Sequence, residues 1–340
     1  MKLYIMNMKE KERIVFFDAI KAFMIFCVVY WHIAIYTGTT DSPLNRIYMP
    51  FFLTSFFFIS GYFSYNEGTM TFHYCVKKII KRCKTLLIPS VVMCALYSLY
   101  SGKISSQVLF DEMKSGYWFT FVTFEIYLFY ILVELCCKFN GWHKLLFYIL
   151  LIFFFSGMTA IGHKWDSLET YRLLSMYQVI KYIPFFYLGI ISKLYQNLFF
   201  RLLRNDFLLG ISIVLMTLLY LNNSRINMCL QGYLGIYLIC ALFYKFKNLF
   251  EQTNSITRFI LMIGQSTLPI YFLHYFFLRG IVVFSSPFQF IMNNGGWILN
   301  GILASVVVLI IISLCISLKK IIGISPTLQF ILLGSKDSRI

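Results

Sequence analysis

The stretch FFDAIKAFMIFCVVYWH, residues 16–32, is apolar enough to cross a lipid bilayer, yet it contains Asp18, Lys21 and His32. A run of about 20 predominantly apolar residues spans the hydrocarbon core of a membrane. Ionisable side chains inside such a run usually face the interior of a helix bundle, where they mark a pathway or a site. The stretch therefore predicts a membrane-spanning helix with one polar face.

The three ionisable residues share that face. At about 100° per residue, the eleven positions from Lys21 to His32 leave the two side chains about 20° apart around the helix. Asp18 and Lys21 are three positions apart and can form an ion pair, while His32 lies roughly 16 Å further along the axis. We interpret this stripe as functional. The alternative is that Asp18 and Lys21 snorkel to the inner interface and that His32 is a packing histidine near the outer one.

The rest of the chain has the composition of an integral membrane protein. Of its 340 residues 59% are hydrophobic and 13% charged, and the mean hydropathy is +0.73. We expect an all-α membrane protein, a bundle of about ten transmembrane helices in a single domain over 1–340 without a separate soluble domain. The expected spans are 14–36, 47–66, 84–102, 117–136, 143–160, 178–195, 206–222, 228–245, 259–278 and 298–318.

The distribution of basic residues predicts the topology. With the N-terminus inside, 21 Lys and Arg residues fall in cytoplasmic segments and 8 in external ones, with Lys21 inside the first span. This excess is the pattern of the positive-inside rule and places both termini in the cytoplasm. The net charge of +16 is therefore explained by topology, and nucleic acid is not an expected partner. The basic N-terminus, without a small-residue cleavage site, predicts a retained signal anchor.

The nine cysteines lie mostly in apolar runs or cytoplasmic segments and contain no CxxC pair. We expect no disulfide framework and no metal site.

Two features suggest chemistry. A histidine titrates near neutral pH, so His32 could take a proton from an attacking hydroxyl and return it to a leaving group, as acyl transfer requires; a proton-coupled transporter would use a histidine equally well. The run KKIIKRCKTLLIP, residues 77–89, presents several cations on the cytoplasmic side. Such a run is often topogenic or binds lipid headgroups, but it also suits a phosphate-rich donor such as coenzyme A.

Six segments in this order resemble membrane acyltransferase family 3, the bacterial O-acyltransferases of surface polysaccharides. They are Asp-x2-Lys…His (18–32), MPFFLTSFFFISGYF (49–63), the basic run ending at Pro89, YWFTFVTFEIYLFY (117–130), YIPFFYLGII (182–191) and IGQSTLPIYFLH (263–274). The resemblance covers most of the chain. It departs from the family at Lys21, where an Arg is usual, and in the basic run, where Lys78-x-x-Lys81 or Lys81-x-x-Lys84 only approximates the family's Arg-x-x-Arg.

The resemblance implies a multi-pass protein of the bacterial plasma (inner) membrane that moves an acyl group, usually acetyl, from cytoplasmic acetyl-CoA to a hydroxyl of a cell-surface or lipid-linked glycan. It implies His32 as general base, Lys21 with Asp18 as the charge beside it, and a donor site on the basic run. Membrane lipids surround such a protein, and the acyl group either goes directly to the glycan or passes to a separate periplasmic acyl-accepting protein. The expected donor-binding residues are Lys78, Lys81, Arg82 and Lys84, and the expected cavity residues are Glu125, Tyr271, His274 and Ser60.

Two other functions compete with this one. A lipid-linked glycan flippase or other secondary transporter would explain the buried charges of Asp18, Lys21 and His32 without an acyl donor. A membrane glycosyltransferase or polymerase would be expected to carry a large, charged external loop, and the external loops predicted here are short.

Overall fold

The computed structural model describes residues 2–65, 71–102, 111–136, 141–161, 169–220, 225–252, 254–280, 290, 292 and 295–334. Every element with assigned bounds in these ranges is a helix, so the predicted all-α class is confirmed. The elements are α1 (Lys2–Thr37), α2 (Pro43–Tyr48), α3 (Phe52–Ser64), α4 (Phe72–Arg82), η1 (Cys83–Leu87), α5 (Ile88–Ser101), η3 (Lys114–Gly116), α6 (Trp118–Cys136), α7 (Gly141–Ile161), α8 (Glu169–Leu173), α9 (Met176–Leu194), α10 (Gln196–Leu203), α11 (Asp206–Tyr220), α12 (Arg225–Lys245), α13 (Lys247–Glu251), α14 (Ser255–Gln265), α15 (Thr267–Leu278), α17 (Trp297–Ile322) and α18 (Pro326–Leu333).

Among the described residues, six helical segments are long and apolar enough to cross a membrane, and two sharply bent pairs could raise the number to eight. The six are Val15–Thr37, Pro43–Ser64, Trp118–Cys136, Trp142–Ile161, Asn227–Lys245 and Trp297–Ile322, and the bent pairs are α10 with α11 and α14 with α15. The predicted count of ten and the cytoplasmic termini stay predictions.

The two expected spans outside this set, 84–102 and 178–195, are helical but less regular or less apolar. The first begins as the π-helical turn η1 and continues as α5. The second is α9, which contains Lys181 and several tyrosines and buries much of its surface against neighbouring helices. A helix surrounded by protein needs fewer apolar residues than one that faces lipid, which explains why hydropathy alone ranks α9 low.

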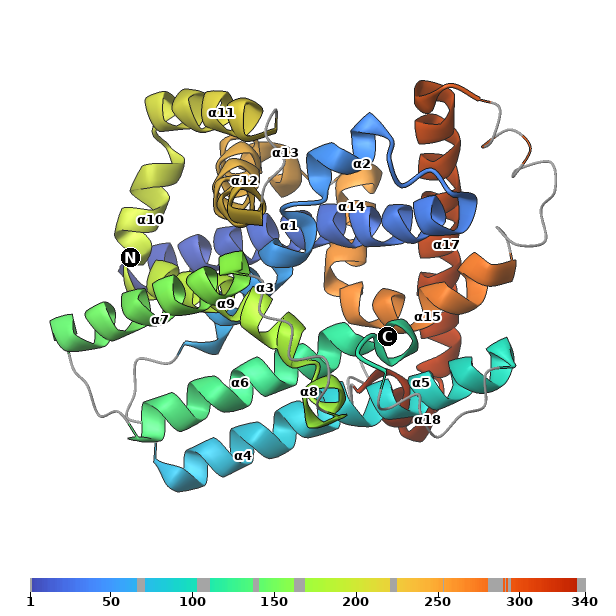
Figure 1. The fold of residues 1–340 in the computed structure, drawn as a ribbon, viewed down its shortest axis with the longest axis horizontal. Helices are drawn as coiled ribbons and strands as arrows, with labels where there is room; N and C mark the ends of the chain where they lie inside the picture. The colour runs from blue at the N-terminus through green and yellow to red at the C-terminus, as the bar shows by residue number, and fades with distance from the viewer. Residues whose placement is uncertain are drawn as a thin grey trace. The chain divides into compact units, whose positions relative to one another are not determined.

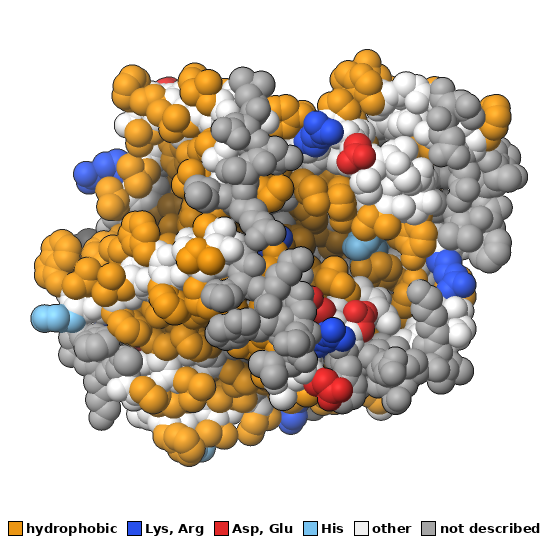
Figure 2. All heavy atoms as spheres, viewed as in Figure 1, with side chains coloured by type: hydrophobic (Ala, Val, Ile, Leu, Met, Phe, Trp, Pro, Cys, Tyr) orange, Lys and Arg blue, Asp and Glu red, His pale blue; other side chains and the backbone are white. Residues whose placement is uncertain are grey.

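Large apolar side chains remain uncovered on the surface. On α7, Leu150, Phe153 and Phe154 are each more than half exposed, and Figure 2 shows hydrophobic side chains over much of the face in view. A soluble monomer rarely exposes apolar surface on this scale, and lipid covers it without cost. The chain is thus a multi-pass membrane protein.

The described residues form two compact units, each made of two separate stretches. Unit 1 is Met1–Phe56 with Asn197–Leu318, and unit 2 is Phe57–Gln196 with Lys319–Ile340. The single domain over 1–340 stays a prediction.

In unit 1, α1 is the central helix and packs against α12, α13, α14 and α15 (Figure 1). The closest approach is at Gly264 of α14, where a Cβ atom would overlap the backbone carbonyl of Asp18. Absence of a side chain here lets the two helix backbones touch, as small residues do in membrane bundles.

In unit 2, α9 packs along α7 and α6, and α4, η1 and α5 follow one another as a long rod beside α6 (Figure 1). Two glycines join α9 to α3 reciprocally. Gly61 of α3 lies against the backbone of Phe186, and Gly189 of α9 lies against the backbone of Phe58. The Ser-Gly and Phe-Phe-x-x-Gly segments of the sequence thus meet in one tight helix crossing.

Candidate functional site

One candidate site is the polar face of α1, and we call its end at Asp18 and Lys21 the inner end and its end at His32 the outer end. Lys21 Nζ lies 2.6 Å from Asp18 Oδ1, so the predicted ion pair is confirmed. The second carboxylate oxygen, Oδ2, accepts a hydrogen bond of 3.2 Å from Gln265 Nε2. Asp18 is buried, and Lys21 keeps a quarter of its side chain exposed. Both oxygens of the buried carboxylate are therefore satisfied, which is the condition under which a buried charge is tolerated.

A sharp bend brings one polypeptide segment to both ends of this face. α14 and α15 are separated by Ser266 and meet at 86°. Gly264 and Gln265, at the end of α14, contact Asp18. α15 then continues to His274 and Tyr275, beside His32, about 21 Å along α1 from Asp18. Pro269 lies in the first turn of α15, where a missing N–H breaks no intrahelical bond.

His32 lies at the outer end of the face. Its Nε2 atom is 3.0 Å from the Tyr275 hydroxyl, a hydrogen-bonding distance, and its ring centroid is 5.2 Å from that of His274. His32 is partly exposed, whereas His274 is fully buried. The structure therefore brings the two histidines together, with their rings tilted by 39° to each other.

The hydrogen bonds of His274 define its tautomer. Its Nδ1 atom lies 2.7 Å from the carbonyl oxygen of Tyr271 and 3.1 Å from that of Ile270. A carbonyl oxygen only accepts, so the proton of the neutral ring is on Nδ1. This leaves Nε2 with a lone pair, buried and without a hydrogen-bond partner among the residues that the structure describes. An unpaired buried acceptor costs free energy and is therefore a feature that function explains better than stability does.

Taken together, the outer end of the face holds two imidazoles and a phenol in mutual contact. The ring of Tyr275 lies 4.7 Å from that of His32 and 4.1 Å from that of His274, centroid to centroid. An imidazole held by a hydrogen bond beside a second proton-accepting group can exchange a proton with a bound hydroxyl.

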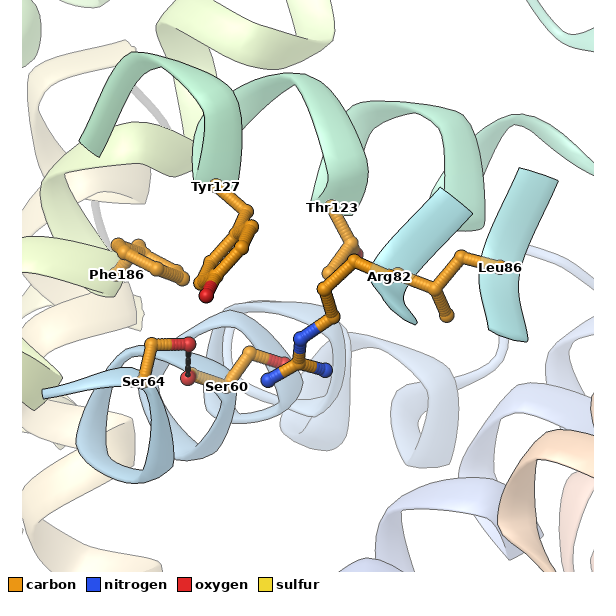
Figure 3. A pocket seen from close by; sticks show the side chains of 7 residues that line it. All are labelled: Ser60, Ser64, Arg82, Leu86, Thr123, Tyr127 and Phe186. Atoms are coloured by element: carbon orange, nitrogen blue, oxygen red, sulfur yellow. Dashed lines mark hydrogen bonds between the residues drawn. The ribbon is translucent and has the colours of Figure 1, made fainter. Parts of the chain in front are cut away.

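A second candidate site is a narrow cleft in unit 2, shown in Figure 3. It is lined by Ser60, Ser64, Arg82, Leu86, Thr123, Tyr127 and Phe186. The guanidinium of Arg82 points toward the α3 serines (Figure 3) and lies 5.0 Å from the ring of Tyr127, a cation–π distance. The Ser64 hydroxyl donates to the backbone carbonyl of Ser60 at 2.6 Å. One cation surrounded by hydroxyl groups is a suitable environment for an anionic oxygen.

The structure does not bring the four predicted donor-binding cations together. Only Arg82 lines the cleft. Lys78 lies over the ring of Tyr74 at 5.2 Å, and Lys81 and Lys84 are exposed. Helical phase explains why Lys81 points elsewhere, because it is one position from Arg82 and about 100° away from it around the helix.

The predicted cavity residues divide between the two units. In unit 1, the ring of His274 lies beside that of His32, and the ring of Tyr271 lies beside that of His274. In unit 2, Ser60 lines the Arg82 cleft. Glu125 of α6 has a carboxylate oxygen, Oε2, that is buried and has no hydrogen-bond partner within the described ranges.

Sequence reasoning did not identify Gln265, Tyr275 or Lys114. Gln265 and Tyr275 lie in or directly beside the segment 263–274 that the resemblance singled out, but nothing in their spacing points to residues some 245 positions earlier. Lys114 is almost fully buried in the turn before α6 and donates to the backbone carbonyls of Asp111 and Arg172, both at 3.1 Å. Burial lowers the pKa of its ammonium group.

Comparison with known proteins gives one match. A family model described as an acyltransferase domain, Acyl_transf_3, matches residues 14–318. No curated protein and no solved structure matches the chain. The matched range contains the part of α1 with Asp18 and His32, the Arg82 cleft and the α14–α15 bend.

Proposed function

The chain belongs to acyltransferase family 3, and from this premise we propose that it transfers an acetyl group from acetyl-CoA to a hydroxyl of a cell-surface or lipid-linked glycan, with His32 as general base. The observation that carries the proposal is the contact of His32 with Tyr275 and His274 on the polar face of a membrane-spanning helix. A membrane acyltransferase needs one such base between its donor and its acceptor.

The chemistry balances with one histidine. The acceptor oxygen attacks the thioester carbonyl while His32 takes its proton; the carbon–sulfur bond then breaks, and the proton goes to the departing thiolate of coenzyme A. An ester is formed and a free thiol is released. The partial exposure of His32 supports its role as the base, because the fully buried His274 is not open to an acceptor.

Arg82 is the residue that we propose for the donor phosphates. Its guanidinium lies in a cleft with three serine or threonine hydroxyls and the tyrosine Tyr127. Arginine forms paired hydrogen bonds with phosphate oxygens, and hydroxyls complete their coordination. The exposed Lys81 and Lys84, with Lys78, would attract the same phosphates from solution.

Asp18 and Lys21 have a supporting role in this proposal. Lys21 stabilises negative charge near the inner end of the face, and Asp18 with Gln265 holds it in place. The acceptor glycan, the separate periplasmic acyl-accepting protein and the bacterial inner membrane all come to the proposal from the family resemblance.

The test is transfer of label from radioactive acetyl-CoA into cell-envelope glycan. Cells that produce the wild-type chain should incorporate acetyl groups, and His32→Ala should lower incorporation by about a hundredfold or more. His143→Ala, at an exposed histidine of α7, is the matched control and should incorporate like wild type. Unchanged incorporation by His32→Ala at equal protein level would remove His32 from the catalytic role.

The bent helix pairs favour a second function, a secondary transporter or lipid-linked glycan flippase. α14 and α15 bend by 86°, and α10 and α11 by 74°. Discontinuous helices with polar groups at the break are typical of transporter sites. Purified protein in liposomes that moves an unmodified lipid-linked glycan, and that forms no acetylated product when acetyl-CoA is supplied, would support the transporter and reject the acyltransferase.

A further inference from the structure

We propose that the C-terminal helix α18 is a positioning element for Arg82, acting through the contact between Gly334 and the π-turn η1. α18 and Gly334 lie outside the residues that the family model matches, 14–318. The inference rests on the donor role proposed above for Arg82 and names residues that would tune it.

Arg82 directly precedes an irregular turn of the helix. Arg82 is the last residue of α4, and the next five residues, Cys83–Leu87, form a single π-helical turn before α5 begins. The backbone N–H of Ile88 bonds to the carbonyl of Cys83, five residues earlier. A π-turn rotates the residues before it relative to those after it, and such turns are common at functional sites. The direction of the Arg82 side chain therefore depends on η1.

η1 is held in place by contacts with α6 and α18. On one side, the hydroxyls of Ser90 and Thr120 share a 2.5 Å hydrogen bond, which ties the start of α5 to α6. On the other side, α18 packs on η1 and α5. The hydroxyl of Thr85, in the middle of the turn, donates to the carbonyls of Lys81 and Arg82 at 3.1 and 3.3 Å. A displacement of Thr85 would thus pass directly to the backbone of Arg82.

Gly334 makes the contact with η1. Gly334 is the C-cap of α18, and it lies so close to the backbone of Thr85 that a Cβ atom would overlap the Thr85 carbonyl. The obstacle is backbone and cannot rotate away. Gly334 also adopts φ +67°, in the left-handed region.

Gly102 shares the left-handed backbone angle of Gly334 but not its close contact. It is the C-cap of α5 and has φ +72°, nearly the value at Gly334, but a Cβ there would meet nothing within 4 Å. Asparagine is the residue after glycine that adopts the left-handed region most readily. Asn at Gly102 therefore tests the backbone angle alone, and Asn at Gly334 adds the clash with Thr85.

The experiment is a double-mutant cycle on the full-length protein in detergent, with the dissociation constant of coenzyme A and the kcat of acetyl transfer as readouts. Arg82→Ala should weaken coenzyme A binding. Gly334→Asn should weaken it by about tenfold, with a smaller change in kcat, and should have less than about a twofold effect in the Arg82→Ala background, because residues that act through one another are not additive. Gly102→Asn should bind coenzyme A like wild type.

The outcomes separate the two proposals. If Arg82→Ala binds coenzyme A normally, the donor site is wrong, and this inference falls with it. If Arg82→Ala weakens binding but Gly334→Asn has no effect, or the same effect in both backgrounds, only the positioning role is wrong. Should Gly334→Asn fail to fold, Leu333→Ala takes its place, because it removes a buried side chain of α18 without adding a clash.

Discussion

The two ends of the polar face of α1 are built by the same segment but differ in how their polar groups are satisfied. At the inner end, both carboxylate oxygens of Asp18 are bonded, one to Lys21 and one to Gln265. At the outer end, His32 lies at hydrogen-bonding distance from Tyr275, and the Nε2 atom of His274 is buried with no hydrogen-bond partner in the described part of the chain.

This difference in hydrogen bonding suggests that the inner end stabilises the fold and that the outer end takes part in the reaction. A fully satisfied buried carboxylate rigidifies the helices around it. A buried acceptor without a partner, such as His274 Nε2, destabilises the fold slightly and is retained where proton transfer is useful. We therefore expect substitutions at the inner end to act mainly on stability and those at the outer end mainly on the rate of transfer.

Gly264→Ala should have the largest effect, because it removes the basis of both ends. The new Cβ would overlap the Asp18 carbonyl, so α14 would have to leave α1 and carry α15 with it. We expect a destabilisation of about 3 kcal/mol or more and loss of transfer activity. Thermal unfolding of the purified protein in detergent measures this, and Gly210→Ala in α11, where the Cβ meets open space, is the control. Equal unfolding temperatures for the two variants would contradict the close packing.

His274→Asn tests the outer end by itself. The asparagine amide can still donate to the Tyr271 carbonyl in place of Nδ1, but nothing replaces Nε2. We expect kcat to fall by about tenfold to a hundredfold, because His274 supports His32 without being open to the acceptor, with little change in unfolding temperature. A variant that transfers acetyl groups at the wild-type rate would show that His274 is a packing residue.

Sequence reasoning reached the inner end more completely than the outer one. The Asp18–Lys21 ion pair could be predicted from sequence spacing, because residues three positions apart on a helix are neighbours. Tyr275 and Gln265 reach α1 only because the chain bends at Ser266. Pro269 in the apolar run 259–278 indicates a kink, but it gives neither the position nor the angle of the bend. The π-turn at Cys83–Leu87 is hidden in the same way, because hydropathy does not report the phase of a helix.

Tyr275→Phe should produce a smaller, purely kinetic effect. It removes the hydroxyl beside His32 Nε2 and leaves the ring contacts with both histidines in place. One hydrogen bond of this kind is worth about 1 kcal/mol, so we expect a fall in kcat of about fivefold to tenfold and a changed pH profile for transfer. If KM for the acceptor rises while kcat and its pH profile stay constant, Tyr275 binds the acceptor instead of orienting His32.

Lys21→Arg should have the smallest effect. The contacts of Asp18 also explain why a lysine serves at position 21, where the family resemblance leads us to expect an arginine. A guanidinium could bond both oxygens of Asp18, but Gln265 already occupies Oδ2, so a single ammonium on Oδ1 suffices. We expect Lys21→Arg alone to change the rate by less than about threefold and Gln265→Ala alone to cost about 1 kcal/mol of stability. In the double variant the arginine should take over both oxygens and recover most of that loss in thermal unfolding. Costs that simply add would mean that the arginine does not take over the carboxylate oxygen that Gln265 leaves, and the single ammonium would then not be explained by Gln265.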